Sequence, residues 1–556
     1  MQGLMQDRPL TIPSLLTRAE RSFGHKRVIT GGAQDTVATW AEVAPRVRRL
    51  AHALDALGVP QGACVGTFAW NSQRHVELYL AIPSSGRVLH TLNHRLHGEQ
   101  LTFIVNDAAD DVLFVDRTIL PVVWPLVSSF DTVRHVVVMD DGGDAPLPDD
   151  PRILDYEQLL VAQPDGPIET VIADERTAAS LCYTSGTTGN PKGVLYSHRS
   201  VVLHSLLLLG ADVFALSESD VVAPIVPMFH VNAWGLPYAA MQCGSDLVLP
   251  GPATAPADLV SLLARHEVTF TAAVATVFRD MIPSLQDHDL SHLRHIACGG
   301  GAVDDALSRT YESLIGVPLT NAWGMTETSP VVTTSRLATV HGDLAPEARR
   351  LLIGSPGPAV PLTEIRIVSD AGVEQPHDGT TPGELQVAGP TIASAYFGSD
   401  NGASSFTADG WLRTGDVGTI DQWGYLRIVD RTKDLVKSGG EWISSVELEG
   451  AVMSDPRVRE AAVIGVADPR WGERPVAFVV PAAGAALTAE DVREHLRGRV
   501  ASWWIPERIV MMSEIPKTAT GKWSKQALRE QFARNDREEN DAHPATADRH
   551  GSQPQW

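Results

Sequence analysis

Residues 183–194, YTSGTTGNPKGV, have the residue types best suited to binding a phosphate. Small Ser, Thr and Gly residues follow an apolar run and lead to Lys192. Small residues let backbone N–H groups approach a polyphosphate closely, hydroxyl groups add donors, and a lysine adds positive charge. The stretch is not a Walker A loop, because no Gly-Lys-Ser/Thr follows at the required spacing. A plain turn has the same residue types, so at this level both interpretations stay open.

The complete string resembles the AMP-binding signature of the acyl-adenylate-forming superfamily, which includes acyl-CoA synthetases, beetle luciferases and the adenylation domains of peptide synthetases. The resemblance implies an enzyme that activates a carboxylic acid with ATP. It also implies that the loop binds the nucleotide phosphates. The implied residues are Thr184, Ser185, Gly186, Thr187, Thr188, Gly189 and Lys192. Further motifs of the family follow in the family's order, up to about residue 530.

A second group of motifs resembles the family's adenylate pocket. Glycines after the apolar run HIAC would let the backbone lie against adenine, although a tight strand-to-helix turn is a compatible interpretation. In residues 321–328, NAWGMTET, the resemblance implies that Trp323 stacks on adenine and Thr326 contacts phosphate. Glu327 would ligate Mg²⁺ together with Thr184, in keeping with a carboxylate-held Mg²⁺ that bridges phosphate oxygens. The other pocket residues expected here are Gly299, Gly300, Gly301, Asn321, Ala322 and Gly324.

Two polar residues and one lysine complete the expected adenylation site. Asp416 in WLRTGD and Arg431 in DRTKD match family positions that bind the ribose hydroxyls, although an ordinary surface Asp–Arg pair would have the same residue types. Residues 516–522, PKTATGK, resemble the C-terminal signature whose last lysine, Lys522, performs adenylation. An ammonium group that bridges the acid and the α-phosphate lowers the barrier electrostatically. Lys517, in the same loop, is not the expected catalytic residue.

The resemblance also implies a hinge and a thiol passage. Lys433 lies at the family's hinge, about which the C-terminal domain rotates between an adenylating and a thioester-forming pose. The glycine turn after Lys437 would let the pantetheine arm of coenzyme A pass close to backbone; a simple hairpin turn is equally compatible with these residues. The residues expected to contact coenzyme A are Lys437, Gly439, Gly440, Glu441 and Trp442.

Residues 226–234, VPMFHVNAW, indicate an acid pocket. His230 resembles a residue that guards the passage between acid and thiol, and Trp234 resembles a gate over the acyl tunnel of long-chain acyl-CoA synthetases. His230 could instead be a core histidine. Ala275 and His94 stand where the family has proline; we expect the first to reshape the acyl site and the second to lie away from it.

The expected reaction uses ATP, Mg²⁺ and coenzyme A to convert a carboxylic acid, here a medium- or long-chain fatty acid, into its acyl-CoA. The sequence strings also resemble a ligase for the short acid 3-methylthiopropionate. A carrier-protein acceptor, a luciferase-like oxidation and a catalytically inactive nucleotide binder are also compatible with the AMP-binding signature. The inactive binder is disfavoured because such a protein would have no need of Lys522.

Composition agrees with an ordinary globular enzyme. The formal net charge of −22 disfavours a general nucleic-acid binder. The cysteines have neither metal-ligand nor disulfide-framework spacing, so we expect buried reduced thiols; they are Cys64, Cys182, Cys243 and Cys298. No apolar run is long enough to span a bilayer and no signal peptide is evident, so a cytoplasmic enzyme is expected. Analogy with bacterial long-chain ligases suggests a homodimer.

Alternating apolar runs and helix-period segments between residues 178 and 325 predict an α/β fold with largely parallel sheets. After about residue 430 the pattern predicts a small mobile α+β domain with helices opened at Ser444 and Thr488. We therefore expect an N-terminal AMP- and acyl-binding domain over 1–430, a hinge at 431–433, a C-terminal domain over 434–534 and a disordered tail over 535–556.

Overall fold

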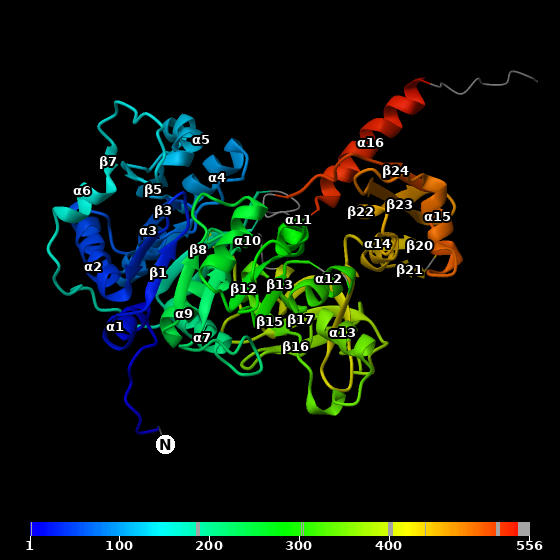
Figure 1. Cartoon of the computed structure of the whole chain (residues 1–556), viewed down its shortest axis with the longest axis horizontal. Helices are drawn as coiled ribbons and strands as arrows, with labels where there is room; N and C mark the ends of the chain where they lie inside the picture. The colour runs from blue at the N-terminus through cyan, green and yellow to red at the C-terminus, as the bar shows by residue number, and fades with distance from the viewer. Residues whose placement is uncertain are drawn as a thin grey trace, which may run out of the picture. The chain divides into compact units, whose positions relative to one another are not determined.

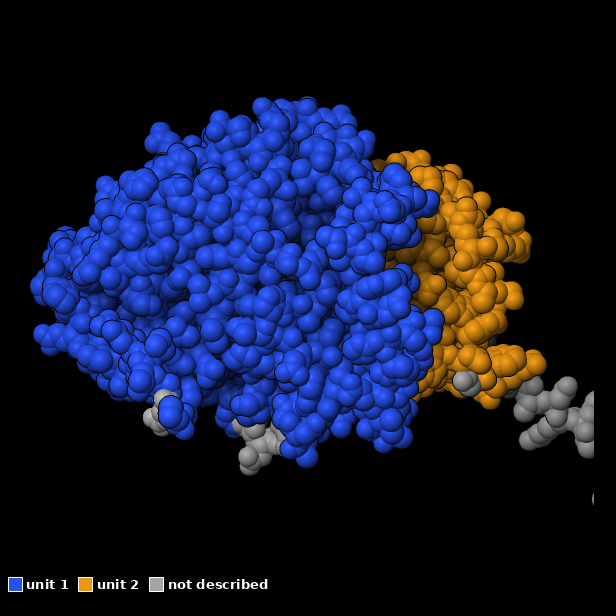
Figure 2. Space-filling view, turned by 90° about the horizontal axis from the view of Figure 1, so that it is seen from below, with its two compact units in different colours: residues 1–429, 519–522 blue, residues 430–518, 523–556 orange. Residues whose placement is uncertain are grey.

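The computed structural model describes most of the chain as two compact units. The described residues are 1, 3–184, 190–301, 303, 305–398, 404–439, 441–518 and 523–542, with side chains described up to residue 535. The first unit comprises residues 1–429, and the second begins at residue 430 (Figure 2). The domain bounds expected from the sequence, with a hinge at residues 431–433, remain predictions.

A seven-stranded sheet forms the N-terminal part of the first unit, with the order β7-β6-β5-β3-β4-β8-β9. Its strands are β3 (Cys64–Phe68), β4 (Val88–Thr91), β5 (Val112–Asp116), β6 (His135–Met139), β7 (Ile153–Asp155), β8 (Ala178–Tyr183) and β9 (Gly193–Ser197). Its helices are α2 (Trp40–Ala56), α3 (Gln73–Ser84), α4 (Gly98–Ala108), α5 (Leu120–Val123) and α6 (Tyr156–Val161). The strands are nearly continuous apolar runs, because helices cover a parallel sheet on its faces. Helices α4 and α5 pack on β5, where Leu101, Val115 and Leu120 share a core (Figure 1).

An eight-stranded sheet follows, with the order β15-β14-β13-β12-β10-β11-β1-β2. Its strands are β1 (Arg27–Thr30), β2 (Thr36–Thr39), β10 (Val221–Pro224), β11 (Asp246–Leu249), β12 (Phe270–Val274), β13 (His295–Gly299), β14 (Leu319–Gly324) and β15 (Val331–Thr334). The helices are α1 (Ile12–Phe23), α7 (His198–Leu208), α8 (Val231–Trp234), α9 (Leu236–Cys243), α10 (Pro256–Arg265), α11 (Ala275–Leu285), α12 (Asp305–Ile315) and α13 (Pro346–Gly354). All pairs are parallel except β1–β2 and β14–β15, which confirms the predicted α/β class.

A third, antiparallel sheet of four strands was not predicted from the sequence. Its strands are β16 (Glu364–Val368), β17 (Gly383–Ala388), β18 (Leu412–Ile420) and β19 (Leu426–Arg431). Ile367, Leu385, Leu412 and Leu426 fill its own small core. The sheet presents Asp416 on β18 and continues into the second unit at the end of β19.

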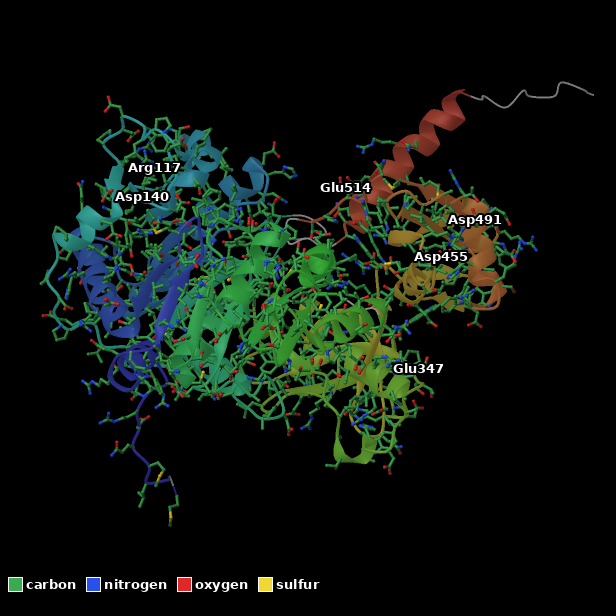
Figure 3. The ribbon with its side chains drawn as sticks, in the orientation of Figure 1. Arg117, Asp140, Glu347, Asp455, Asp491 and Glu514 are labelled. Atoms are coloured by element: carbon green, nitrogen blue, oxygen red, sulfur yellow. The ribbon has the colours of Figure 1, made fainter. Side chains whose placement is uncertain are left out.

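The described residues of the second unit form a five-stranded sheet with three α-helices, in agreement with the predicted α+β pattern. The strands are β20 (Val436–Ser438), β21 (Glu441–Ile443), β22 (Val458–Asp468), β23 (Gly472–Pro481) and β24 (Arg508–Met511). The helices are α14 (Ser445–Met453), α15 (Ala489–Leu496) and α16 (Lys525–Ala542). Ser444 caps α14 by accepting from the Glu447 amide, and Thr488 forms a full capping box with Asp491. Asp491 is labelled in Figure 3.

The predicted disordered tail begins too early. Helix α16 continues to Ala542, so residue 535 lies within a helix rather than at its end. The sequence of 525–542 is rich in Arg, Glu, Gln and Ala, which have high helix propensity, and its Leu528 and Phe532 are buried in the core of the second unit. Residues 543–556 lie outside the described part.

The four cysteines are free and buried, as expected. In the described part of the chain, no helix has the length and apolar character needed to cross a membrane.

Candidate active site

The phosphate loop leaves the first sheet at the hairpin between β8 and β9. The Thr184 amide donates to the Lys192 carbonyl at 2.9 Å, and the Lys192 amide donates to Thr184 Oγ1 at 3.4 Å. These two bonds close the neck of the loop at the hairpin. The five remaining predicted loop residues lie outside the described residues; they are Ser185, Gly186, Thr187, Thr188 and Gly189.

Lys192 and Glu327 meet through Tyr396, a residue that the sequence motifs did not single out. Lys192 Nζ lies 4.7 Å from the centroid of the Tyr396 ring. The Tyr396 hydroxyl donates to Glu327 Oε1 at 2.6 Å. Burial raises the pKa of Tyr396 well above its ordinary value, and the neighbouring Glu327 carboxylate raises it further, so the phenol stays a donor.

Glu327 has the environment of a residue that binds a cation. It lies in the short helix η3 (Thr326–Thr328), is only 6% exposed, and pairs with no basic side chain among the described residues. A buried carboxylate without an ion-pair partner is costly, and a bound divalent cation removes that cost. The described residues contain no cluster of three or more His, Cys, Asp or Glu side chains suited to a metal. A single buried carboxylate such as Glu327 nevertheless fits Mg²⁺, which is usually held by one or two carboxylates together with substrate phosphates and water. The metal roles of Glu327 and Thr184 remain predictions.

Thr326 and the adjoining backbone are fixed by buried contacts. The Tyr196 hydroxyl donates to the Thr326 carbonyl at 2.6 Å, and both residues are buried. The turn that bears Thr326 and Glu327 is therefore fixed against β9, the strand that leaves the phosphate loop.

Gly299, at the end of β13, lies beside Ala322 of β14 in the parallel register. A Cβ on Gly299 would lie 2.7 Å from the Ala322 carbonyl and 2.9 Å from Trp234 Cη2. Only glycine leaves room there, and the indole of Trp234 reaches the glycine expected to face adenine. Gly300 has a φ of +78°, whereas a Cβ on Gly301 would meet no atom within 4 Å.

Trp323 and Asp416 are brought together from different sheets. The Trp323 Nε1 donates to Asp416 Oδ2 at 3.0 Å, and Asp416 is buried on β18. This bond fixes the indole plane expected against adenine beside the carboxylate expected on ribose. Asn321 donates to the Gly354 carbonyl at 2.8 Å, and a side chain on Gly324 would collide with the Pro330 carbonyl.

The predicted acid-pocket segment contains a left-handed turn. Val231, Asn232, Ala233, Trp234 and Gly235 have φ values of 48°, 52°, 50°, 56° and 72°. This conformation costs roughly 1–2 kcal/mol per L-residue, so the buried surroundings must hold it. Asn232 Nδ2 donates to Ser180 Oγ of β8 at 2.9 Å, which anchors the turn to the strand leading into the phosphate loop.

His230 precedes this turn, and its amide donates to the Pro227 carbonyl at 3.0 Å. His94 was expected to lie away from the acid pocket, which is wrong. Its ring lies 4.8 Å from Phe229 and 4.5 Å from Trp70, and burial lowers its pKa to about 4. Its aromatic ring fills space against Phe229, a contact that its place in the chain did not reveal. Ala275 is the first residue of α11, a position where proline is readily accommodated.

The second unit holds the predicted glycine turn and hinge residues. Gly439 has a φ of +63°, and its amide donates to the Trp471 carbonyl at 2.7 Å. A Cβ on Gly439 would lie 3.0 Å from Trp471 Cε3, while the indoles of Trp442 and Trp471 are exposed. Arg470 lies 4.6 Å from the Trp471 ring. A bare backbone beside exposed aromatic rings and a cation suits a slender polar chain that carries a nucleotide.

The remaining predicted residues of the second unit lie near these elements in sequence. The Lys437 amide donates to Glu473 at 2.8 Å, and Glu441 is exposed on β21. The Lys433 carbonyl accepts from Arg529 of α16 at 3.2 Å. Arg431 ends β19, and Gly440 lies outside the described residues.

Lys522 also lies outside the described residues, so its catalytic role remains a prediction. The two ends of its loop are described. Lys517 and Trp523 form an isolated antiparallel β-bridge, and the Ser524 amide donates to the Pro516 carbonyl at 2.7 Å. Lys517 itself pairs with Glu460 at 3.3 Å. A lysine in an ion pair is less free to bridge substrates, which agrees with the choice of Lys522.

The chain belongs to the AMP-binding enzyme family, whose model matches residues 16–397. The model of the AMP-binding enzyme C-terminal domain matches residues 447–522. These matches confirm the resemblance drawn from the motifs, together with the fold of a large N-terminal and a small C-terminal domain.

Individual relatives are similar over nearly the whole chain. A long-chain-fatty-acid–CoA ligase of Thermus thermophilus is 45% identical over 536 residues, covering 95% of this chain and 96% of that protein. A 3-methylmercaptopropionyl-CoA ligase of Ruegeria lacuscaerulensis is 41% identical over 536 residues, covering 96% and 99%. The crystal structure of the anthranilate CoA ligase AuaEII with anthranoyl-AMP has a TM-score of 0.86 at 27% identity, covering 96% and 100%. Together they indicate an AMP-forming acid–thiol ligase.

Proposed function

We propose that this protein is an ATP-dependent acyl-CoA ligase that acts on a medium- or long-chain fatty acid. The observation that carries the proposal is the arrangement around Tyr396, which brings Lys192 and the buried Glu327 to one side chain. A lysine and a buried carboxylate beside a phosphate-type loop suit a nucleoside triphosphate with its divalent cation.

The reaction has two half-reactions. In the first, a carboxylate oxygen of the acid attacks the α-phosphorus of ATP, the bond to the bridging oxygen breaks, and pyrophosphate leaves. In the second, the thiolate sulfur of coenzyme A attacks the acyl carbon, and AMP leaves with the electron pair of the broken bond.

The residues of the chain have separate roles in this scheme. Lys192 offsets charge on the outer phosphates, and Lys522 offsets the charge that gathers where acid and α-phosphate meet. Trp323 and Asp416 hold the nucleoside, joined by their hydrogen bond. Glu327 and Thr184 would hold Mg²⁺, which would neutralise charge on the phosphates.

Identity of the acid rests on similarity and on the apolar segment at 226–234. The relative from Thermus thermophilus is named for long-chain fatty acids, and Val226, Met228, Val231 and Trp234 are buried apolar residues. A short acid is the second candidate, because the Ruegeria relative is named for 3-methylmercaptopropionate. In either case Trp234 would gate the acyl site and His230 would guard the passage to the thiol.

Coenzyme A is the proposed acceptor, and a carrier protein is the second candidate. The exposed Trp471 beside Gly439 and the exposed Trp442 on β21 support an acceptor that ends in a nucleotide, since bases stack on aromatic rings. Lys437, Gly440 and Glu441 would line the same passage. The proposal includes rotation of the C-terminal domain about Lys433, a cytoplasmic location and a homodimer, all by analogy with the family.

The test measures AMP release and thioester formation with saturated acids from propionate to stearate, with and without coenzyme A. AMP release that requires both acid and coenzyme A is expected, and the preferred chain length identifies the substrate. Adenylate that accumulates without transfer to coenzyme A would favour a carrier-protein acceptor. A chain that binds ATP but uses none of these acids would contradict the fatty-acid assignment.

A further inference from the structure

Residues 391–397 form a strap between the third sheet and the nucleotide site. On one side, the Ala393 amide donates to the Glu327 carbonyl at 2.8 Å, and Ser329 Oγ donates to the Thr391 carbonyl at 2.8 Å. On the other side, the Phe397 amide donates to the Gly193 carbonyl at 2.8 Å. The strap therefore joins the turn that carries Glu327 to the residue that follows Lys192.

Tyr396 is the strap residue whose side chain contacts both charged groups. Its hydroxyl donates to Glu327 Oε1 at 2.6 Å, and its ring faces Lys192 Nζ at 4.7 Å. The edge of Phe406 packs on the same ring at 5.9 Å between centroids, which restricts its rotation. Tyr396 is half-buried, so both interactions are partly shielded from water.

The chemistry of these contacts favours a positioning role over simple packing. A carboxylate that ligates a metal is commonly oriented by a hydrogen bond from a neighbouring group. A lysine held over an aromatic ring keeps its charge and its donors for an anionic ligand. If Lys192 and Glu327 paired with each other, their charges would cancel, and neither would be free for the phosphates or the cation. Tyr396 engages each of them separately.

We propose that Tyr396 is a positioning residue that holds the Glu327 carboxylate for Mg²⁺ and the Lys192 ammonium for the ATP phosphates. This inference rests on the proposed function and deepens it. It assigns two separable tasks to one side chain: the hydroxyl serves the cation, and the ring serves the phosphates.

Two substitutions separate the tasks. Tyr396→Phe removes only the hydroxyl and keeps the ring beneath Lys192, whereas Tyr396→Leu removes both. Tyr425→Phe is the matched control, because it deletes a hydroxyl that donates to the Arg336 carbonyl at 2.6 Å, at a buried tyrosine of the same unit. The Tyr425 hydroxyl also accepts from the Ala338 amide at 3.2 Å, so the control accounts for the general loss of a tyrosine hydroxyl together with its hydrogen bonds.

The test measures binding rather than turnover. Mn²⁺, used as a paramagnetic substitute for Mg²⁺, is titrated with each protein and a non-hydrolysable ATP analogue and followed by electron paramagnetic resonance. Affinity for the analogue without metal is measured by calorimetry, and the unfolding midpoint by thermal denaturation. We expect Tyr396→Phe to weaken Mn²⁺ binding about 10-fold with unchanged metal-free analogue affinity. Tyr396→Leu should in addition lower the metal-free affinity for the ATP analogue, by about 5-fold.

Each outcome has a distinct meaning. Wild-type Mn²⁺ affinity in Tyr396→Phe would overturn the positioning role, as would equal losses in Tyr425→Phe. A wild-type protein that binds no ATP analogue would instead overturn the proposed function, so the two failures are distinguishable.

Discussion

The nucleotide site of the first unit and the glycine turn of the second unit are held in different ways. In the first, Glu327 and Asp416 are buried, and each accepts a hydrogen bond from an aromatic side chain. In the second, the exposed Trp471 lies beside the backbone of Gly439, and the exposed Trp442 pairs with Lys437 in the adjoining strands. The rigid site suits a reaction that needs fixed phosphates and a fixed cation, and the open turn suits a long flexible thiol that enters later. Substitutions should therefore affect the two half-reactions unequally.

The largest expected effect is that of Lys522→Ala, which should impair adenylation and leave thioester formation intact. Lys522→Ala should lower the rate of adenylation by about 10³-fold, because it removes the charge that stabilises the developing pentavalent phosphate. Transfer to coenzyme A from supplied acyl-adenylate should be nearly unchanged. Pyrophosphate exchange measures the first step, and thioester release from the adenylate measures the second.

Lys517→Ala is the control for this experiment. Its ammonium pairs with Glu460 at 3.3 Å and is partly exposed, so its loss should leave pyrophosphate exchange within about 3-fold of wild type. If Lys517→Ala abolished adenylation and Lys522→Ala did not, the assignment of the catalytic lysine would be reversed.

Lys433→Pro should produce the opposite pattern, with adenylation spared and thioester formation reduced by about 10²-fold or more. Proline fixes φ and so prevents the rotation that the thiol half-reaction needs, whereas a unit already in the adenylating pose is unaffected. The same two assays measure the effect. Equal loss of both half-reactions would contradict the assignment of Lys433 as the hinge.

Gly299→Ala tests the packing of the nucleotide site, with a smaller expected effect. The added Cβ would lie 2.7 Å from the Ala322 carbonyl and 2.9 Å from Trp234, so the strand edge must shift. We expect roughly 1–3 kcal/mol of destabilisation and about a 10-fold higher KM for ATP. Gly450→Ala is the control, because its Cβ would meet no atom within 4 Å and Gly450 lies outside the predicted nucleotide pocket. Similar KM values for both variants would show that the close packing at Gly299 does not shape the nucleotide site.

The sequence could predict this rigid site only in part, and the reason differs from residue to residue. Gly299 and Asn321 lie in short contiguous motifs that resemble the family's motifs, and their roles at the nucleotide remain predictions. Tyr396 was missed because its role arises from two contacts that lie about 69 and 204 positions away along the chain. The left-handed turn at 231–235 was not foreseeable, since Val, Ala and Trp have no preference for that conformation.

Helix α16 shows that composition alone can also mislead a prediction of disorder. Its charged residues resembled a solvated tail in composition, but their helix propensity extended the helix to Ala542. The motifs do not identify the acid either, because a pocket lined by scattered apolar residues leaves no contiguous signature in the sequence. The contact between Phe229 and His94 shows that even a residue expected to be distant shapes that segment.

The smallest expected effect concerns stability and again contrasts the two units. In the first unit, burial lowers the pKa of His75 and His198 to about 4 and that of His204 to about 3. In the described part of the second unit the one histidine is His495, whose pKa is lowered by burial and whose Nδ1 lies 3.7 Å from Asp455 Oδ2. The unfolded chain protonates histidine near pH 6.5, whereas the folded first unit keeps these three rings neutral.

The sign of the pH effect follows from this difference. The stability that the neutral rings contribute is complete above about pH 6.5 and is lost as the pH falls toward 4, because the unfolded state then binds more protons. Between pH 7 and pH 6 each of these histidines should lower the free energy of unfolding by about several tenths of a kcal/mol. Hydrogen exchange followed peptide by peptide, corrected for the intrinsic pH dependence of exchange, should show the first unit losing protection before the second. A second unit that loosens first would mean that its carboxylate–histidine contact, rather than the buried histidines, sets the acid limit of the protein.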